Sequence, residues 1–236
     1  MIAMTVDTEW CPDSVIEDTI SLLESYDVSA TLFSTHNDSV ATAEHERALH
    51  PNLFDEERNE RAVIDDIAAH YPDASGIRTH GLYVHSPLRN VYPEFGLTYE
   101  SNYIEYLRDG IKPFWLFDGV LQFPIYFMDD MWLRTRADEG HLPDPGTLLD
   151  GGGLQVYDFH PVHVFLNTPK IEYYQTHKEY YDDPEYLRER RAEGPGVRDL
   201  FVELLAEIER RDESTRTLGE LDEAFRAEND LSDIRI

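Results

Sequence analysis

Short apolar runs and amphipathic segments alternate along the first part of the chain. Residues 2–6 and 28–33 are apolar and rich in β-branched side chains, which is typical of buried strands. Between them, Ile16, Ile20 and Leu23 recur at helical spacing. The pattern predicts a βαβ unit whose two strands are parallel and joined by a right-handed crossover.

Strand and helix signals continue to alternate further along the chain. Strands are expected at 47–49, 101–107, 121–127 and 154–159, with another ending at 77–81, and helices at 55–70, 170–191 and 196–211. A capping box at residues 217–220 begins the last helix. This order predicts an α/β fold, and since no repeat or linker divides the sequence, we expect residues 1–236 to form one domain.

The net charge is strongly negative. The chain carries 48 acidic and 20 basic residues, for a formal charge of -28. Such a balance argues against nucleic-acid or anionic-membrane partners, because the mean field repels phosphate. The acids could form a cation-binding or substrate-steering surface. Their spread along the whole chain, with lysine only at Lys112, Lys170 and Lys178, instead favours adaptation to high salt and predicts a halophilic source.

Cysteine usage and hydropathy bound the cellular setting. Cys11 is the sole cysteine, which excludes an intrachain disulfide and a cysteine-based zinc site. The N-terminus has no signal-peptide pattern, and no apolar run is long enough to cross a bilayer. We therefore expect a cytoplasmic protein without membrane insertion.

Polar side chains follow four of the expected strands. Carboxyl ends of strands are where open α/β sheets bind ligands. Carboxylate together with imidazole is the ligand set of a catalytic zinc or similar ion. A lone histidine at such a position is more often structural, so the inference depends on the conjunction. The residues concerned are Asp7 and Glu9, His50, Arg78 and His80, and His160.

Four segments resemble a known family in sequence order. They are Met-Thr-Val-Asp-Thr-Glu-Trp at 4–10, His-Glu-Arg-Ala-Leu-His-Pro-Asn at 45–52, Arg-Thr-His-Gly-Leu at 78–82 and Asp-Phe-His-Pro at 158–161. Together they resemble the NodB-homology polysaccharide deacetylases, a carbohydrate esterase superfamily, and most of all its WbmS-like branch. The resemblance covers most of the chain. It implies a distorted (β/α) barrel of about seven strands.

The resemblance implies distinct roles for the first two acids. Asp7 matches the aspartate that acts as general base on the attacking water. Glu9 matches the acid that ligates the metal in variants with one intervening residue. Alternation along a continuing strand would turn both toward one site. The alternative is that Glu9 faces solvent and Asp7 alone points inward.

The histidine motif departs from the family pattern. His50 matches the first metal-binding histidine, but the usual second histidine, four residues later, is Phe54 here. Either the site has lost a ligand or another side chain replaces it. His80 is our candidate replacement, with His36 a weaker one. A role for His80 in substrate binding or in supporting a ligand stays open.

The remaining matches complete a catalytic set. Arg78 matches the third-motif arginine and would hold Asp7 ionised and oriented. Asp130, within the segment 124–132, would orient that arginine, unless it is simply a solvated acid. His160 matches the general acid that protonates the leaving group, a role that suits the pKa of histidine.

The expected function is metal-dependent removal of an acetyl group from an N- or O-acetylated sugar or polysaccharide precursor. The resemblance implies one divalent ion, for which we expect zinc, with cobalt or nickel as alternatives. A hydrolase of a non-sugar amide is a second possibility. A third is a degenerate member that binds glycans or serves as a scaffold, which the loss of histidine at Phe54 keeps open. The oligomeric state does not follow from the sequence.

Overall fold

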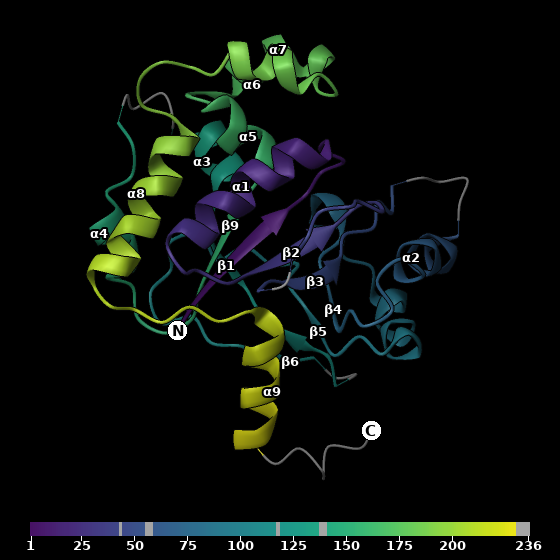
Figure 1. Cartoon of the computed structure of the whole chain (residues 1–236). Coiled ribbons are helices and arrows are strands. Elements are labelled where there is room, and N and C mark those ends of the chain that lie inside the picture. The colour runs from purple at the N-terminus through teal and green to yellow at the C-terminus, as the bar shows by residue number, and fades with distance from the viewer. Residues whose placement is uncertain (43, 55–58, 117–118, 137–140, 230–236) are drawn as a thin grey trace.

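A curled sheet of nine short strands forms the centre of the protein (Figure 1). The computed structural model describes residues 1–42, 44–54, 59–116, 119–136 and 141–229. The strands are β1 (Ile2–Asp7), β2 (Ala30–Ser34), β3 (Glu46–Leu49), β4 (Gly76–Ile77), β5 (Tyr99–Glu100), β6 (Phe114–Trp115), β7 (Leu121–Gln122), β8 (Ile125–Met128) and β9 (Gln155–Phe159). Their order is β6-β7-β5-β4-β3-β2-β1-β9-β8. All neighbours are parallel except β6 and β7.

β1 occupies an interior position between β2 and β9, and all six of its residues are buried. A parallel strand covered on both faces needs apolar side chains on both, which Ile2, Ala3, Met4 and Val6 supply. The predicted parallel βαβ opening is therefore confirmed. Its consequence for the site is that Asp7 projects from the end of a rigid, fully covered strand.

The sheet curls until its two ends meet. β8 is the last strand of the order and β7 lies next to the first, yet only Phe123 and Pro124 separate them in sequence. Pro124 has no backbone N–H and interrupts the ladder at that point. Ile104, beyond β5, pairs with Ile125 of β8 and links the two edges. The predicted distorted barrel is confirmed: with β6 set aside, eight of the nine strands surround the interior, and they count as seven if β7 and β8 are taken as one interrupted strand.

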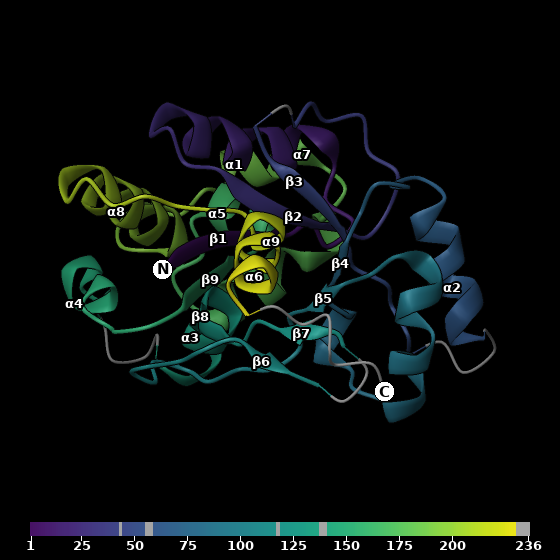
Figure 2. The same ribbon diagram turned by 90° about the horizontal axis from the view of Figure 1, so that it is seen from below.

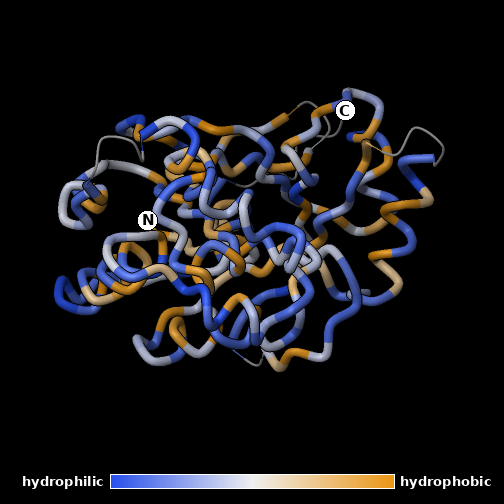
Figure 3. The backbone as a smooth tube through the Cα atoms, turned by 90° about the horizontal axis from the view of Figure 1, so that it is seen from above, coloured by the Kyte–Doolittle hydropathy of each residue, from blue (hydrophilic) through white to orange (hydrophobic). Residues whose placement is uncertain are grey.

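Helices cover the outside of the sheet. α5 packs against both α1 and α8 on one side, and α2 lies on the other (Figure 1). The peripheral helices alternate between hydrophilic and hydrophobic along their turns (Figure 3). No helix in the described part of the chain is long and apolar enough to cross a membrane. The α-helices are α1 (Asp13–Ser25), α2 (Glu60–Ala68), α3 (Asp129–Thr135), α4 (Pro145–Leu149), α5 (Pro161–Leu166), α6 (Ile171–His177), α7 (Pro184–Glu189), α8 (Val197–Arg210) and α9 (Leu218–Glu228).

Several predicted boundaries differ from the structure. The helix predicted at 55–70 is described from Glu60 onward, and residues 55–58 lie outside the described part. The strand predicted at 101–107 is reduced to the single pairing of Ile104. The helix predicted at 170–191 is broken before Pro184, because a proline disfavours helical backbone at the preceding residue.

The last helix closes the barrel at the amino ends of the strands (Figure 2). α9 begins at the predicted capping box, in which Thr217 and Glu220 bond each other's backbone N–H groups. The backbone N–H of Leu218 donates to Thr31 Oγ1 of β2, and that of Gly219 donates to a Glu46 carboxylate oxygen of β3. The opposite, carboxyl end of the strands is left for the site.

The packing of Gly76 in β4 generates a test of the fold. A Cβ at Gly76 would lie 1.9 Å from Cζ of the buried Tyr99 ring. Gly76→Ala should therefore lower the free energy of unfolding by about 2 kcal/mol, measured by chemical denaturation. Ser75→Ala is the matched control and should change it by less than about 0.5 kcal/mol. A variant Gly76→Ala as stable as the control would contradict this packing.

Candidate active site

A buried arginine occupies the centre of the carboxyl end of the sheet. Arg78 follows β4 directly, and its side chain is 0% exposed. Its Nη1 lies 2.8 Å from Asp7 Oδ1 and 2.5 Å from Asp158 Oδ1. Nε and Nη2 donate to the carbonyl and hydroxyl oxygens of Ser101 at 3.0 and 2.8 Å. The guanidinium also stacks over the Phe33 ring at 4.1 Å, so that its position is fully determined.

Two carboxylates share this one cation, and their pKa values move apart. Burial alone would raise the pKa of Asp7, but the charges of Arg78 and His50 outweigh it and lower that pKa. Burial raises the pKa of Asp158 to about 7, against the opposing charge of Arg78. Oδ2 of Asp158 is buried and has no hydrogen-bond partner among the described residues. At neutral pH Asp7 is therefore the ionised member, and Asp158 is poised to hold a proton.

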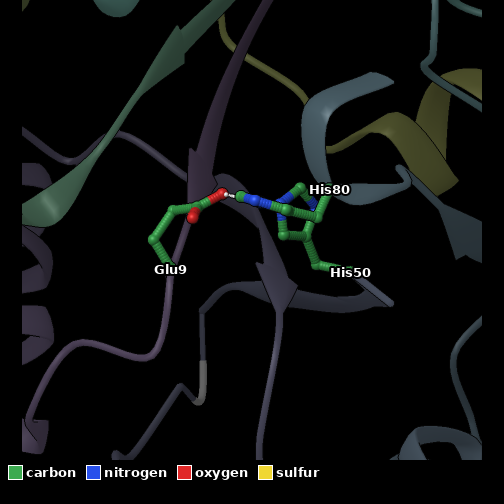
Figure 4. A group of neighbouring side chains, drawn as sticks. All are labelled: Glu9, His50 and His80. Carbon is green, nitrogen blue, oxygen red and sulfur yellow. Dashed lines mark hydrogen bonds and ion pairs between the residues drawn. The ribbon is translucent and has the colours of Figure 1, made fainter. Parts of the chain in front are cut away.

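Glu9, His50 and His80 converge beside Asp7 (Figure 4). One potential ligand atom from each lies within 4.8 Å of the others. Glu9 Oε1 is 2.9 Å from His50 Nε2 and 2.8 Å from His80 Nδ1. A carboxylate oxygen only accepts hydrogen bonds, so both ring nitrogens donate to it. Burial alone would raise the pKa of Glu9, but these two hydrogen bonds hold it well below its usual range.

The chain reaches Glu9 by a turn rather than by strand alternation. β1 ends at Asp7, and Glu9 and Trp10 both have positive φ, at 48° and 56°. The expected inward orientation of Glu9 thus arises from a left-handed backbone, not from a continuing strand. His80 also lies beyond the end of its strand: β4 ends at Ile77, and His80 begins a short 3-10 turn in which Gly81 has φ 63°.

Phe54 stands where the family pattern expects a second histidine, and it does not reach inward. Its side chain is 56% exposed and contacts the rings of His80 and Tyr83 edge-on, at 6.4 and 5.4 Å between centroids. A Cβ on Gly81 would lie 2.8 Å from the Phe54 ring, so the glycine makes room for it. Through these contacts Phe54 packs against the histidine that we predicted as the replacement ligand.

His160 is held by Asp129, which the sequence prediction missed. His160 Nδ1 lies 2.6 Å from Asp129 Oδ1, and its backbone N–H donates to Oδ2 of the same residue. Asp129 is fully buried at the start of α3. Burial alone would lower the pKa of His160, but the charge and hydrogen bond of Asp129 hold it well above its usual range. The ring therefore keeps its proton at neutral pH.

The predicted role of Asp130 needs correction. Its carboxylate accepts from Arg134 Nε at 2.7 Å, one helical turn away, and lies 3.9 Å from His163 Nε2. Among the described residues the acids that bind Arg78 are Asp7 and Asp158, not Asp130. Successive residues of a helix point in different directions, so only one acid of the pair at 129–130 can face the site.

Asp158 could have been found from the sequence. It lies within the predicted strand 154–159, two residues before His160, so alternation places both on one face. An ionisable residue inside an otherwise apolar strand is a signal for a buried partner. One ligand-type atom each of Asp7, Asp158 and His160 lie within 4.8 Å of one another.

The other histidines near the motifs have structural contacts. His45 Nδ1 accepts from the backbone N–H of Ala30. His36 Nδ1 contacts the neighbouring Thr35 hydroxyl. The buried His163 contacts Thr168 through Nδ1.

The donor set of Glu9, His50 and His80 fits a divalent ion. One carboxylate and two imidazoles form a common catalytic zinc set that leaves a position open. Ligand atoms around a tetrahedral zinc lie about 3.3 Å apart, so contacts of 2.8 and 2.9 Å need only a small expansion to admit an ion. Such an ion would replace the two protons that now lie between the carboxylate and the rings.

Comparison with known proteins agrees with this geometry. Residues 4–178 match the family of WbmS-like polysaccharide deacetylases. The structure is similar to WbmS of Bordetella bronchiseptica, described as a candidate polysaccharide deacetylase involved in O-antigen biosynthesis. The two are 28% identical with a TM-score of 0.74, over 87% of this chain and 90% of that one. The search of curated proteins finds no match.

More distant structures share the fold alone. A candidate polysaccharide deacetylase of Mycobacterium smegmatis is 17% identical with a TM-score of 0.59, over 96% of this chain and 90% of that one. A CE4-family pseudoenzyme of Bacillus anthracis is 11% identical with a TM-score of 0.51, over 94% of this chain and 65% of that one. The fold is therefore shared with a protein described as a pseudoenzyme.

The raised pKa of Asp158 predicts a pH-dependent stability. The unfolded carboxyl titrates near 3.8 and the folded one near 7, so the folded state binds the proton more tightly between these values. The contribution of this group to stability is present below pH 4 and is lost as the pH rises to 7. Asp158→Asn does not titrate and should gain stability relative to the native protein over that range, measured by urea unfolding. A stability difference independent of pH would contradict the assignment.

Proposed function

We propose that the chain, which belongs to the WbmS-like family of polysaccharide deacetylases, is a divalent-metal-dependent hydrolase that removes an acetyl group from an N- or O-acetylated sugar. The observation that carries the proposal is the convergence of Glu9, His50 and His80 beside the ionised Asp7. A precursor of a surface polysaccharide is the substrate we favour, because the Bordetella relative is described as taking part in O-antigen biosynthesis.

Glu9, His50 and His80 would hold the ion. When bound there, a divalent ion supplies Lewis acidity, which polarises the acyl carbonyl and makes a water molecule more acidic. We infer zinc from the ligand types, with cobalt and nickel as alternatives.

Asp7 is the base in this proposal. Its Oδ2 lies 3.6 Å from His50 Nε2, so it adjoins the ligand set without belonging to it. Arg78 occupies the other oxygen at 2.8 Å and keeps the carboxylate ionised and oriented. Asp7 accepts the proton of the water that attacks the acyl carbon.

His160 is the acid. Its Nδ1 is bound to Asp129, so the proton available for transfer is on Nε2. As the bond between the acyl carbon and the sugar nitrogen or oxygen breaks, His160 donates this proton to the leaving amine or alkoxide. The products are acetate and a free sugar amine or hydroxyl.

Phe54 supports a second candidate function. A member that lacks the usual second histidine could bind glycans without catalysis, and a pseudoenzyme shares this fold. A third reading keeps the chemistry and changes the substrate to a non-sugar amide. The retained base, arginine and acid favour catalysis, since a binding protein needs no proton-transfer pair.

Metal binding and acetate release together distinguish these candidate functions. We expect one divalent ion per chain, measured by metal analysis after dialysis against zinc, and its loss in His50→Ala. Asp7→Asn should keep the ion and lose at least about 100-fold in acetate release from N-acetylglucosamine oligomers or acetylated xylan.

His70→Ala, which removes an exposed imidazole in the loop after α2, is the control and should change neither value. A folded protein that binds no zinc, cobalt or nickel would refute the catalytic proposal and favour glycan binding. Metal binding without acetate release from either glycan would favour the non-sugar amide.

The hydrogen bond between Asp129 and His160 leads to a prediction about the pH range of activity. The acid must carry its proton, so activity is present below the pKa of His160 and is lost as the pH rises through it. Asp129→Asn removes the charge that raises this pKa, so the alkaline limb of the rate profile should move down by about one to two pH units. Asp130→Asn, whose acid contacts Arg134 instead, should move it less. Equal shifts in the two variants would contradict the pairing of Asp129 with His160.

A further inference from the structure

The backbone that carries Glu9 is unfavourable on its own. Glu9 and Trp10 are consecutive non-glycine residues with φ of 48° and 56°. Left-handed backbone brings Cβ close to the following carbonyl oxygen, so such pairs persist only where surrounding contacts hold them. Without such contacts the turn would relax and carry the Glu9 carboxylate away from His50 and His80.

Two side-chain oxygens hold this turn. The Tyr181 hydroxyl donates to the carbonyl oxygen of Glu9 at 2.6 Å. The backbone N–H of Trp10 donates to Thr35 Oγ1 at 2.8 Å. Tyr181 lies between α6 and α7, 172 residues beyond Glu9, so the contact is purely tertiary.

Cys11, Tyr181 and the Glu9 carbonyl form a chain of hydrogen bonds in which each donor and acceptor can be assigned. Cys11 Sγ lies 2.9 Å from the Tyr181 oxygen. The Glu9 carbonyl can only accept, which commits the phenolic proton to it, so the thiol must donate to the phenolic oxygen.

We propose that Tyr181, supported by the Cys11 thiol, is a positioning residue that fixes the main chain of Glu9 in the conformation needed for metal binding. Tyr181 lies outside residues 4–178, the part of the chain that matches the family. The inference rests on the proposed metal site. Its physical basis is preorganisation: a ligand held in place before the ion arrives loses less freedom on binding.

Tyr181→Phe removes only the hydroxyl. We expect the dissociation constant for zinc to rise about tenfold, measured on metal-free protein by competition with a chromophoric chelator. Tyr180→Phe is the matched control: this neighbour is 40% exposed and stacks on Tyr186, and its zinc affinity should equal that of the native protein.

Cys11 supplies an independent pair of variants. Cys11→Ser keeps a donor for the phenolic oxygen and should retain most of the affinity, whereas Cys11→Ala should weaken it several-fold. The absorption spectrum of the cobalt-loaded protein should change in Tyr181→Phe, because the carboxylate is displaced relative to the two rings. If the Tyr181 hydroxyl were purely structural, Tyr181→Phe would lower the melting temperature, but the zinc affinity of the folded variant and the spectrum of its cobalt-loaded form would be unchanged.

The outcomes are separable. Native affinity in folded Tyr181→Phe and Cys11→Ala would overturn the positioning role and leave the metal site intact. Failure of the native protein to bind any divalent ion would overturn both the positioning role and the proposed function. If Tyr181→Phe does not fold, unchanged affinity in Cys11→Ala alone overturns the inference.

Discussion

The structure of the site depends on one buried cation. Arg78 is removed from water and lies within hydrogen-bond distance of two carboxylates that belong to adjacent strands, β1 and β9. Leaving a buried charge unpaired is strongly unfavourable, so at least one of these two acids must stay ionised beside it. One positive charge cannot compensate two negative ones, and Asp158 consequently favours its protonated form while Asp7 stays ionised. Charge balance thus decides which of the two acids is ionised, and this supports the proposal that Asp7 is the base.

Other acids around the site are also paired with hydrogen-bond donors or positive charges. Glu9 is flanked by two imidazoles, and its hydrogen bond also raises the pKa of His80. His160 keeps its proton because the charge of Asp129 and its hydrogen bond to the ring raise the pKa of the imidazole. Each acid near the strand ends is therefore matched to a specific cation or donor. The large acid excess of the chain is a separate matter, and the halophilic source and cytoplasmic location inferred from its sequence stay predictions.

Much of the site could be predicted because strand ends are local features. An apolar run followed by Asp7, or ended by His50, signals both the strand and the face where its terminal side chain emerges. The choice between the acids at 129 and 130 could not be predicted, because it depends on the rotation of α3 against β9. Asp158 was missed although its place within an apolar strand is a signal for a buried partner; only the identity of that partner, Arg78, 80 residues away, required the structure.

The sequence by itself determined the alternation of strands and helices, the order of the motifs and the set of residues able to form a site. Those properties follow from hydrophobic periodicity and residue type, which act over a few neighbouring residues. Tertiary structure decided which of these residues meet. It placed His80 against Glu9, and it brought Tyr181 to the Glu9 carbonyl. The reason is physical: contacts between distant segments depend on how the sheet curls and where loops turn, and no local pattern encodes that.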